Sequence, residues 1–248
     1  MTDLLEHLRQ EVLLCDGAMG SRVQQADLDI EIDYWGQENC TEILNLSRPD
    51  IVREIQAGFV AAGSDILLTN TFGGSPITLA EFDLQDKTHE INKRAGELAR
   101  EALGEFHRDG ISRYVLGDIG PGTKLPSLGQ IDYDELEAAL AAQSAGLLAG
   151  GVDGIMIETV QDILQLKAAV NGARMAMAEA GRQVPLLTQI TVETTGTMLV
   201  GTDIAGAATV INALGIDVMG LNCATGPREM AEHVRWLSEQ WPGVISIQ

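Results

Sequence analysis

The sequence is poor in basic residues, in aromatic residues and in long hydrophobic runs. Lys and Arg number 16 against 36 Asp and Glu, which gives a formal net charge of −20. A surface of that charge repels phosphate backbones and anionic lipid headgroups, so nucleic acids and membranes are not expected partners. Aromatic residues make up 4% of the chain, too few for a platform on which bases stack. No segment approaches the roughly 20 consecutive apolar residues of a membrane-spanning helix.

Cysteine is also scarce. The chain has three, Cys15, Cys40 and Cys223, and an odd, widely spaced set argues against a disulfide scaffold. The first residues, Met1–Glu6, do not combine a basic region with a following apolar one, so they do not form a signal peptide. We therefore expect a protein of the reducing cytoplasm.

Short apolar runs alternate with helical segments along the whole chain. The runs lack strict polar alternation, as expected for strands that are covered on both faces. They are Val12–Cys15, Asp65–Leu68, Tyr114–Gly117, Gly154–Glu158, Leu186–Ile190, Asp217–Leu221 and Val244–Ile247. Amphipathic stretches between them include Asp86–Phe106, Tyr133–Ala149, Gln161–Ala180 and Arg228–Gln240. This order predicts an α/β protein with a parallel sheet.

A weak internal repeat supports the same fold. Gly63, Gly151 and Gly215 each stand at the end of a helical stretch, and an Asp follows two residues later at the start of a strand. No Gly-x-Gly-x-x-Gly follows the first run, which disfavours a dinucleotide-binding sheet. Seven strands separated by helices favour a (β/α)₈ TIM barrel, of which about seven strands are present.

An unclosed barrel would expose two sheet edges. We therefore expect residues 1–248 to form one barrel domain that lacks its carboxyl-terminal βα units, and we expect the natural polypeptide to continue or a partner to fill the gap. The long segment Ser21–Pro49 follows the first predicted strand and carries Tyr34 and Trp35. It is expected to lie on the strand-end face and to cover a pocket there.

Active sites of such barrels lie at the carboxyl ends of the strands. The predicted strands end in Asp16–Gly20, Thr69–Gly73, Gly117–Pro121, Glu158–Thr159, Gln189–Glu193 and Asn222–Pro227. The four histidines fall in helical stretches away from these ends, which disfavours a His-based metal triad or a Ser–His nucleophile; they are His7, His89, His107 and His233. No lysine falls within a predicted strand, which argues against a Schiff-base aldolase. The cysteine, carboxylates and small polar residues that remain suit an amino acid and one soft metal.

Each of these strand-end residues has a functional and a structural interpretation. Cys223 is either a metal-binding thiol or an inert buried side chain. Glu158 is either a buried anion that awaits a cation or a cap for the next helix. Asp16 is either an ammonium ligand or a turn-former. Asn70 and Thr71 suit ligand contacts and loop hydrogen bonds equally well.

Taken together, the strand ends resemble the homocysteine S-methyltransferase family. The segments that carry the resemblance run in order over nearly the whole chain: Asp16–Gly20, Ala62–Asp65, Thr69–Phe72, Gly117–Pro121, Glu158–Thr159 and Gly220–Ala224. The resemblance is greatest to the homocysteine-binding module of the cobalamin-dependent members. It implies a TIM barrel that transfers a methyl group to the thiol of homocysteine, giving methionine. The implied methyl donor is methylcobalamin on another domain or subunit.

The resemblance further implies a zinc ion held by three cysteines. Cys223 matches the first of them and is thereby the implied catalytic and metal-binding residue. The other two form an adjacent pair in the family and are expected beyond Gln248, since Cys15 and Cys40 do not fit the pattern. Zinc would bind the substrate thiol, whose free pKa is about 8.5, and favour the thiolate that attacks the methyl group.

The resemblance also implies a substrate site, made of Asp16, Gly17, Ala18, Thr71, Glu158 and Asn222. Asp16 and Glu158 would face the ammonium group with Thr71 nearby, and the main chain at Gly17–Ala18 would hold the amino-acid end. This chain departs from the family at Asp118, where other members have Ser or Ala.

Two other functions remain open at this point. One is a methyltransferase subunit that demethylates a different substrate and passes the methyl group to a corrinoid protein. The other is a non-catalytic barrel that binds an amino acid.

Overall fold

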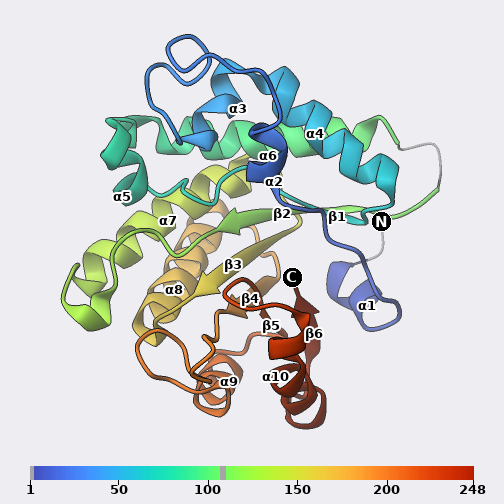
Figure 1. The fold of residues 1–248 in the computed structure, drawn as a ribbon, viewed down its shortest axis with the longest axis vertical. Helices are drawn as coiled ribbons and strands as arrows, with labels where there is room; N and C mark the ends of the chain where they lie inside the picture. The colour runs from blue at the N-terminus through green and yellow to red at the C-terminus, as the bar shows by residue number, and fades with distance from the viewer. Residues whose placement is uncertain (1–2, 107–109) are drawn as a thin grey trace.

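The protein is built on one parallel sheet. The computed structural model describes residues 3–106 and 110–248. Six strands pair in chain order, every neighbouring pair is parallel, and the sheet curls into part of a barrel (Figure 1). They are β1 (Ile66–Leu68), β2 (Tyr114–Ile119), β3 (Gly154–Val160), β4 (Leu186–Ile190), β5 (Val218–Leu221) and β6 (Val244–Ile247). The predicted α/β class and parallel sheet are confirmed.

Long helices connect the strands. They are α4 (Pro49–Ala62), α6 (Thr88–Gly104), α7 (Tyr133–Ala149), α8 (Ile163–Ala180), α9 (Ile204–Ala213) and α10 (Pro227–Gln240). Successive helices from α4 to α8 pack against one another on the outer side of the sheet (Figure 1). Their apolar faces meet Val115, Ile119, Ile155, Ile157 and Met219 of the strands, and these residues belong to the largest hydrophobic cluster.

Shorter helices occupy the connections. They are α1 (Leu4–Leu8), α2 (Met19–Val23), α3 (Leu44–Ser47) and α5 (Pro76–Leu79), with 3₁₀ turns η1 (Thr41–Ile43), η2 (Ala80–Phe82), η3 (Gln85–Lys87) and η4 (Pro126–Leu128). Local sequence explains several helix boundaries. Asp162 and Asp203 accept amide hydrogen bonds at the starts of α8 and α9. Pro49 and Pro227 occupy the first turns of α4 and α10, where a missing amide hydrogen costs nothing.

The Gly–x–Asp repeat has a clear structural role. Gly63, Gly151 and Gly215 all have positive φ and reverse the chain between a helix and the next strand. The carboxylate of Asp153 then accepts a hydrogen bond from the amide of Val115 on the preceding strand. Asp65 does the same for the amide of Leu14. The repeat therefore fixes both the turn and the register of the strand that follows.

The prediction of seven strands is not confirmed, because the run Val12–Cys15 forms only an isolated bridge between Cys15 and Ile66. Side chains take over hydrogen bonds that a ladder would use: Leu14 N–H donates to Asp65, and Leu68 N–H donates to the Asp16 carboxylate. Val12 is 90% exposed and Leu14 is 58% exposed, so little packing holds the run flat on the sheet. The structure thus shows six strands of a partial barrel.

The inner side of the curled sheet has two layers of side chains. The lower layer, near the amino ends of the strands, is apolar and consists of Ile66, Tyr114, Leu116, Met156, Leu187 and Val218 together with Leu4 of α1. The upper layer, near the carboxyl ends, is polar and consists of Asp118, Glu158, Gln189 and Asn222. Alternation along a strand explains the two layers: Leu116 and Asp118 share one face of β2, two residues apart.

A cavity of about 990 Å³ opens beside the lower layer, between the segment Leu8–Asp16 and β6. Within the described part of the chain, no helix combines the length and the apolar character needed to cross a membrane.

Candidate functional site

A second cavity, of about 890 Å³, lies at the carboxyl ends of the strands. It lies where sequence analysis placed the active site, and it brings together every site residue predicted from the sequence. Those residues all line it: Asp16, Gly17, Ala18, Thr71, Glu158, Asn222 and Cys223. The three described histidines, His7, His89 and His233, lie on helices and do not line it, and His107 lies outside the described residues.

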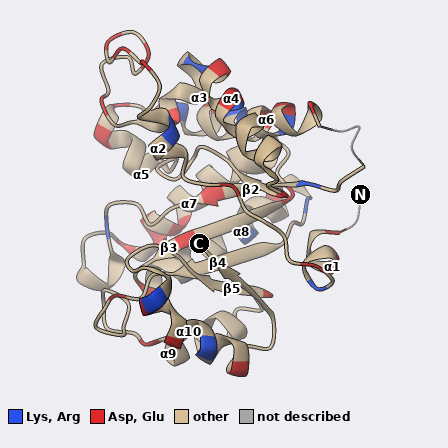
Figure 2. Cartoon of the chain, turned by 45° about the vertical axis from the view of Figure 1, so that its right-hand side comes forward, with Lys and Arg blue, Asp and Glu red and all other residues tan. Residues whose placement is uncertain are grey.

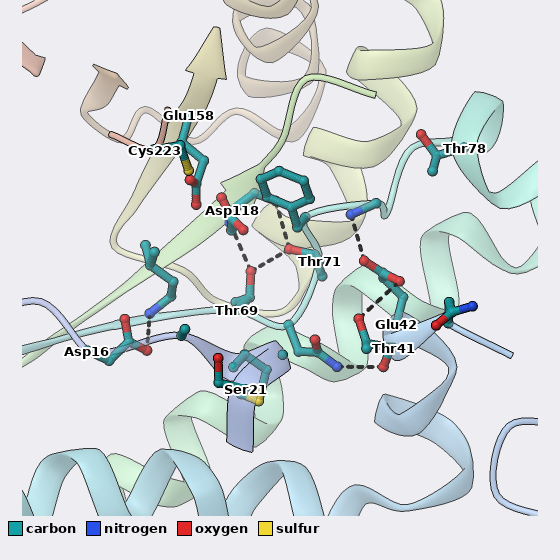
Figure 3. A pocket seen from close by; sticks show the side chains of 18 of the residues that line it. Asp16, Ser21, Thr41, Glu42, Thr69, Thr71, Thr78, Asp118, Glu158 and Cys223 are labelled. Carbon is teal, nitrogen blue, oxygen red and sulfur yellow. Dashed lines mark hydrogen bonds between the residues drawn. The ribbon is translucent and has the colours of Figure 1, made fainter. Parts of the chain in front are cut away.

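Three carboxylates line this cavity, one from the segment that runs beside β1 and two from the adjacent strands β2 and β3. Asp16 is anchored beside β1 through the amide of Leu68, at 3.0 Å. Asp118 and Glu158 are on β2 and β3, where Asp118 pairs in register with Met156, two residues before Glu158. Acidic segments accordingly mark β2 and β3 in Figure 2, and the close view shows Asp118 between Glu158 and Thr71 (Figure 3). Asp118 is therefore the middle member of the row.

The electrostatics of the cavity favour the protonated forms of Asp16 and Asp118. Burial and, to a smaller extent, the charge of Glu158 raise the pKa of Asp16 to about 7, against the lowering effect of the Leu68 amide. Burial also raises the pKa of Asp118 well above its ordinary range, and the charge of and hydrogen bond with Glu158 add to the effect. None of the described residues that line the cavity is Lys, Arg or His. A positively charged ligand would relieve this accumulation of negative groups.

Asn222 joins the ends of β3 and β5. Its Oδ1 accepts the amide of Thr159 at 2.9 Å, and its Nδ2 donates to the Thr159 hydroxyl at 2.8 Å and to the Glu158 carboxylate. The Asn222 side chain is therefore occupied by protein partners that set the positions of Glu158 and Thr159. Thr159 itself has a φ of 56°, which is unusual for a β-branched residue and marks local backbone strain.

Cys223 follows β5 and is exposed at the cavity. Its Sγ lies 3.7 Å from the Thr159 hydroxyl and 3.5 Å from Asn222 Nδ2, and its φ of 59° turns the chain at this point. The side chain is thus at the strand tips, and not packed among the outer helices, as the sequence prediction requires. This position makes the thiol accessible to a ligand in the cavity.

The described residues alone do not fit a resident zinc ion. A structural or catalytic zinc site needs three or four ligands, and no group of three or more His, Cys, Asp or Glu among the described residues is arranged to hold a metal. Cys15 lines the lower cavity, and Cys40 is fully buried beside Glu42. Burial raises the pKa of both thiols to about 12, which disfavours the thiolate form that binds metals. Cys223 is left as a single ligand.

Thr71 and Asn70 make the loop contacts that sequence analysis held open for them. The Thr71 hydroxyl donates to the main-chain oxygen of Asp118 at 2.7 Å and contacts the Thr69 hydroxyl at 2.6 Å. Asn70 donates to the main-chain oxygen of Thr41 at 2.7 Å. These bonds tie the end of β1 to β2 and to the Ser21–Pro49 segment.

The Ser21–Pro49 segment covers part of the cavity, but through residues other than the two expected aromatic ones. Thr41 and Glu42 line the cavity, whereas Trp35 is 44% exposed and Tyr34 packs against neighbouring apolar groups. Glu42 accepts the Gly73 amide at 2.6 Å, and burial raises its pKa. No spacing or motif in the sequence distinguishes Glu42 from the many surface acids.

The glycine at position 17 has a packing reason. A Cβ there would lie 2.8 Å from the ring of Phe59 on α4, whereas a Cβ at Gly20 would meet open space. Ala18 stands directly before α2. The predicted strand end Gln189–Glu193 is the one that does not reach the cavity; Gln189 is buried and donates to Ser246 of β6.

A parallel α/β partial barrel with an accessible cysteine and carboxylates at its strand tips belongs to the class of (β/α)-barrel proteins, whose functional sites lie at the carboxyl ends of the strands. The family model described as "Homocysteine S-methyltransferase" matches residues 13–248. The chain belongs to the homocysteine S-methyltransferase family.

Two curated relatives are methionine synthases. The chain is 48% identical over 246 residues to those of Mycobacterium leprae (strain TN) and Mycobacterium tuberculosis (strain ATCC 25618 / H37Rv). The match covers 99% of this chain but only 20% and 21% of the relatives, so the chain spans about a fifth of their length.

Solved structures share the fold. The metallated form of the homocysteine methyltransferase MmuM from Escherichia coli superposes with a TM-score of 0.78 at 18% identity, over 99% of this chain and 87% of that one. Its apo form gives a TM-score of 0.70 at 17% identity, over 95% of this chain and 81% of that one.

Proposed function

We propose that this chain is the homocysteine-binding part of a methyltransferase that methylates the homocysteine thiol to give methionine. The observation that carries the proposal is the accessible Cys223 thiol in one cavity with Asp16 and Glu158. An amino acid with a terminal thiol presents a cation at one end and sulfur at the other. The cavity offers matching groups for both.

The side chains divide the work of binding between the two ends of the substrate. Asp16 and Glu158 accept hydrogen bonds from the ammonium group, and the main chain at Gly17–Ala18 holds the carboxylate end. Thr71 fixes the neighbouring strand end, and Asn222 fixes Glu158 and the turn that carries Cys223. With its amino-acid end held, the substrate directs its thiol toward Cys223, so the sulfur is oriented before it reacts.

Cys223 contributes one ligand to a zinc site whose other ligands come from outside these 248 residues. A bound zinc ion would stabilise the thiolate form of the substrate. We assign residues 1–248 to a homocysteine-binding barrel domain, completed by further βα units. The methyl donor we propose is methylcobalamin on a corrinoid-carrying domain or partner, in keeping with relatives about five times as long. The cytoplasm, where thiols stay reduced, is the compartment we propose.

The test is Cys223→Ser in the complete protein, with Cys15→Ser as the matched control. We expect Cys223→Ser to lower zinc content and to slow homocysteine methylation from methylcobalamin by about a thousandfold or more, since serine is a poor zinc ligand. The melting temperature should change little because Cys223 is exposed. Cys15→Ser, in the lower cavity, should retain both zinc and activity.

Zinc content and methylation that survive Cys223→Ser would contradict the proposal. A complete protein that binds homocysteine but methylates nothing would instead be an amino-acid-binding barrel. Methyl transfer from another substrate to the corrinoid, without homocysteine methylation, would identify the demethylating subunit.

A further inference from the structure

Asp118 carries a buried acceptor without a partner at the wall of the cavity. It is 4% exposed, lines the cavity, and its Oδ1 has no hydrogen-bond partner in the described part of the chain. Its two neighbours are already engaged: Asp16 Oδ2 accepts the Leu68 amide, and Glu158 Oε2 accepts from Asn222 and Thr159. A buried carboxylate oxygen without a partner is costly, so its place at a cavity wall points to a missing donor.

The main chain around Asp118 is rigidly held. Its amide donates to the Thr69 hydroxyl at 2.9 Å. Its carbonyl oxygen accepts from the Thr71 hydroxyl at 2.7 Å and from Gln143 of α7 at 3.3 Å. The carboxylate is therefore presented at a fixed point on β2, between the strand lines of Asp16 and Glu158. The charges of Asp16 and Glu158 both act on Asp118, and all three carboxyl groups line one cavity, so one small cation can bind among them.

We propose that Asp118 is a specificity-determining residue, a third acceptor for a primary ammonium group alongside Asp16 and Glu158. The inference rests on the proposed function and extends it. A primary ammonium has three N–H donors and no acceptor, so three carboxylates satisfy it completely. A hydroxyl or an acylated amine cannot satisfy three carboxylates in this way.

A consequence is proton release on binding. The groups that face Asp118 are Glu158 from β3, Asp16 beside β1 and Glu42 from η1, and all of them are acidic. Burial and this negative surrounding raise the pKa of Asp118, which favours its protonated form in the empty cavity. An ammonium brings a positive charge next to the carboxyl group, lowers its pKa and displaces the proton to solvent.

The experiment is calorimetric binding of L-methionine to the protein at pH 8 in two buffers of different ionisation enthalpy. L-Methionine keeps the ammonium and carboxylate ends of homocysteine, and its thioether cannot release a proton. N-acetyl-L-methionine, which lacks the cation, is the ligand control. The variants are Asp118→Asn, Asp118→Ser and, as the matched control, Asp217→Asn, whose side chain pairs with Arg9 at the opposite ends of the strands.

For the unaltered protein we expect net proton release when L-methionine binds and no measurable binding of the N-acetyl compound. Both Asp118 variants should bind L-methionine roughly tenfold to a hundredfold more weakly, since a charge-assisted hydrogen bond is lost. Their proton release should fall toward zero, which a merely structural change would not cause. Asp217→Asn should match the unaltered protein in both quantities.

Two results overturn the inference, and they differ in their meaning. If the Asp118 variants melt normally and bind L-methionine with unchanged affinity and proton release, Asp118 is not an ammonium ligand, although the proposed function stands. If the unaltered protein binds neither L-methionine nor homocysteine, the proposed function fails and the inference fails with it.

Discussion

The two layers inside the curled sheet use the same strands for opposite purposes. The lower layer is apolar, and its polar exception, the Tyr114 hydroxyl, meets His7 Nδ1 at 3.0 Å. The upper layer is polar, and within the described part of the chain two of its buried oxygens, Asp118 Oδ1 and Gln189 Oε1, have no partner. One layer stabilises the sheet, and the other leaves interactions open for a ligand.

The backbone shows the same contrast. At the lower end, the turns with positive φ that precede strands are made by Gly63, Gly151 and Gly215, which adopt this conformation at little cost. At the upper end, Thr159 and Cys223 have positive φ without being glycine. Such conformations cost of order 1 kcal/mol or more each and persist where surrounding contacts enforce them. The positive φ values of Thr159 and Cys223 thus place backbone strain at the candidate site.

The contrast between the two layers is tested most directly on β2, where Leu116 belongs to the lower layer and Asp118 to the upper layer on the same strand face. Leu116 is fully buried and fills the space left by Gly154, whose added Cβ would lie 2.8 Å from it. Leu116→Ala should lower the free energy of unfolding by about 3 kcal/mol through lost burial and a residual cavity. Asp118→Asn should leave it unchanged or higher, because the change removes a buried ionisable group from beside Glu158 and Asp16. Urea denaturation of both variants measures the difference.

Equal destabilisation by the two changes would contradict the division of labour between the layers. A conservative control is Leu116→Met, which keeps the volume and should cost less than about 1.5 kcal/mol.

The fold was largely predictable because each element carries its own local signal. Glycine at helix ends, proline in first turns and apolar runs between them predicted all six observed strands to within two residues and α7 at its observed bounds. The first run, Val12–Cys15, was misjudged as a strand. Hydrophobicity alone does not show that Asp16 and Asp65 side chains replace its ladder bonds.

The location of the candidate site was predictable from the sequence, but several of its residues and contacts were not. Strand-end position together with the family resemblance predicted that Asp16, Glu158 and Cys223 would lie together, and all three line one cavity. Glu42 escaped notice because only the folded Ser21–Pro49 segment carries it to the cavity. The engagement of Asn222 with β3 also depends on strand neighbours that are 63 residues apart in sequence, and no local pattern reports such contacts.

A smaller effect is expected on the pH dependence of stability, which tests the electrostatic difference between the two layers. The folded pKa of Asp16, about 7, exceeds its ordinary value, so its contribution to stability is full below about pH 4 and is lost as pH rises toward 7. Asp16→Asn removes this loss and keeps an oxygen to accept the Leu68 amide. Its stability relative to the unaltered protein should therefore rise between about pH 4 and 7, by about 2 kcal/mol after allowance for partial solvent contact.

Thermal melts across that pH range measure this gain. Leu116→Ala serves as the control, since an apolar change should shift the curve by the same amount at every pH. A constant offset for Asp16→Asn as well would show that the Asp16 carboxyl group titrates in the folded protein as it does in the unfolded chain.

The smallest predicted effect isolates backbone strain on either side of β5. Ala224 follows the strand, is exposed and has a φ of 56°, whereas Gly215 precedes it with a φ of 66°. Ala224→Gly should stabilise the protein by about 0.5 kcal/mol, since relief of left-handed strain exceeds the added entropy of the unfolded chain. Gly215→Ala should destabilise it by about 1 kcal/mol, although a Cβ there meets only the end of Arg174, 4.0 Å away.

Opposite signs for these two single-methyl changes, measured by denaturant unfolding, would show that the strand-tip turn is held in a conformation its sequence does not favour. The enforcing contacts are those of the neighbouring Cys223 and Asn222 with Thr159. If Ala224→Gly also weakens L-methionine binding, the strain contributes to keeping the turn in its binding shape. If both changes destabilise, the turn at Ala224 is relaxed, and the contrast between the two ends of the sheet lies in the side chains alone.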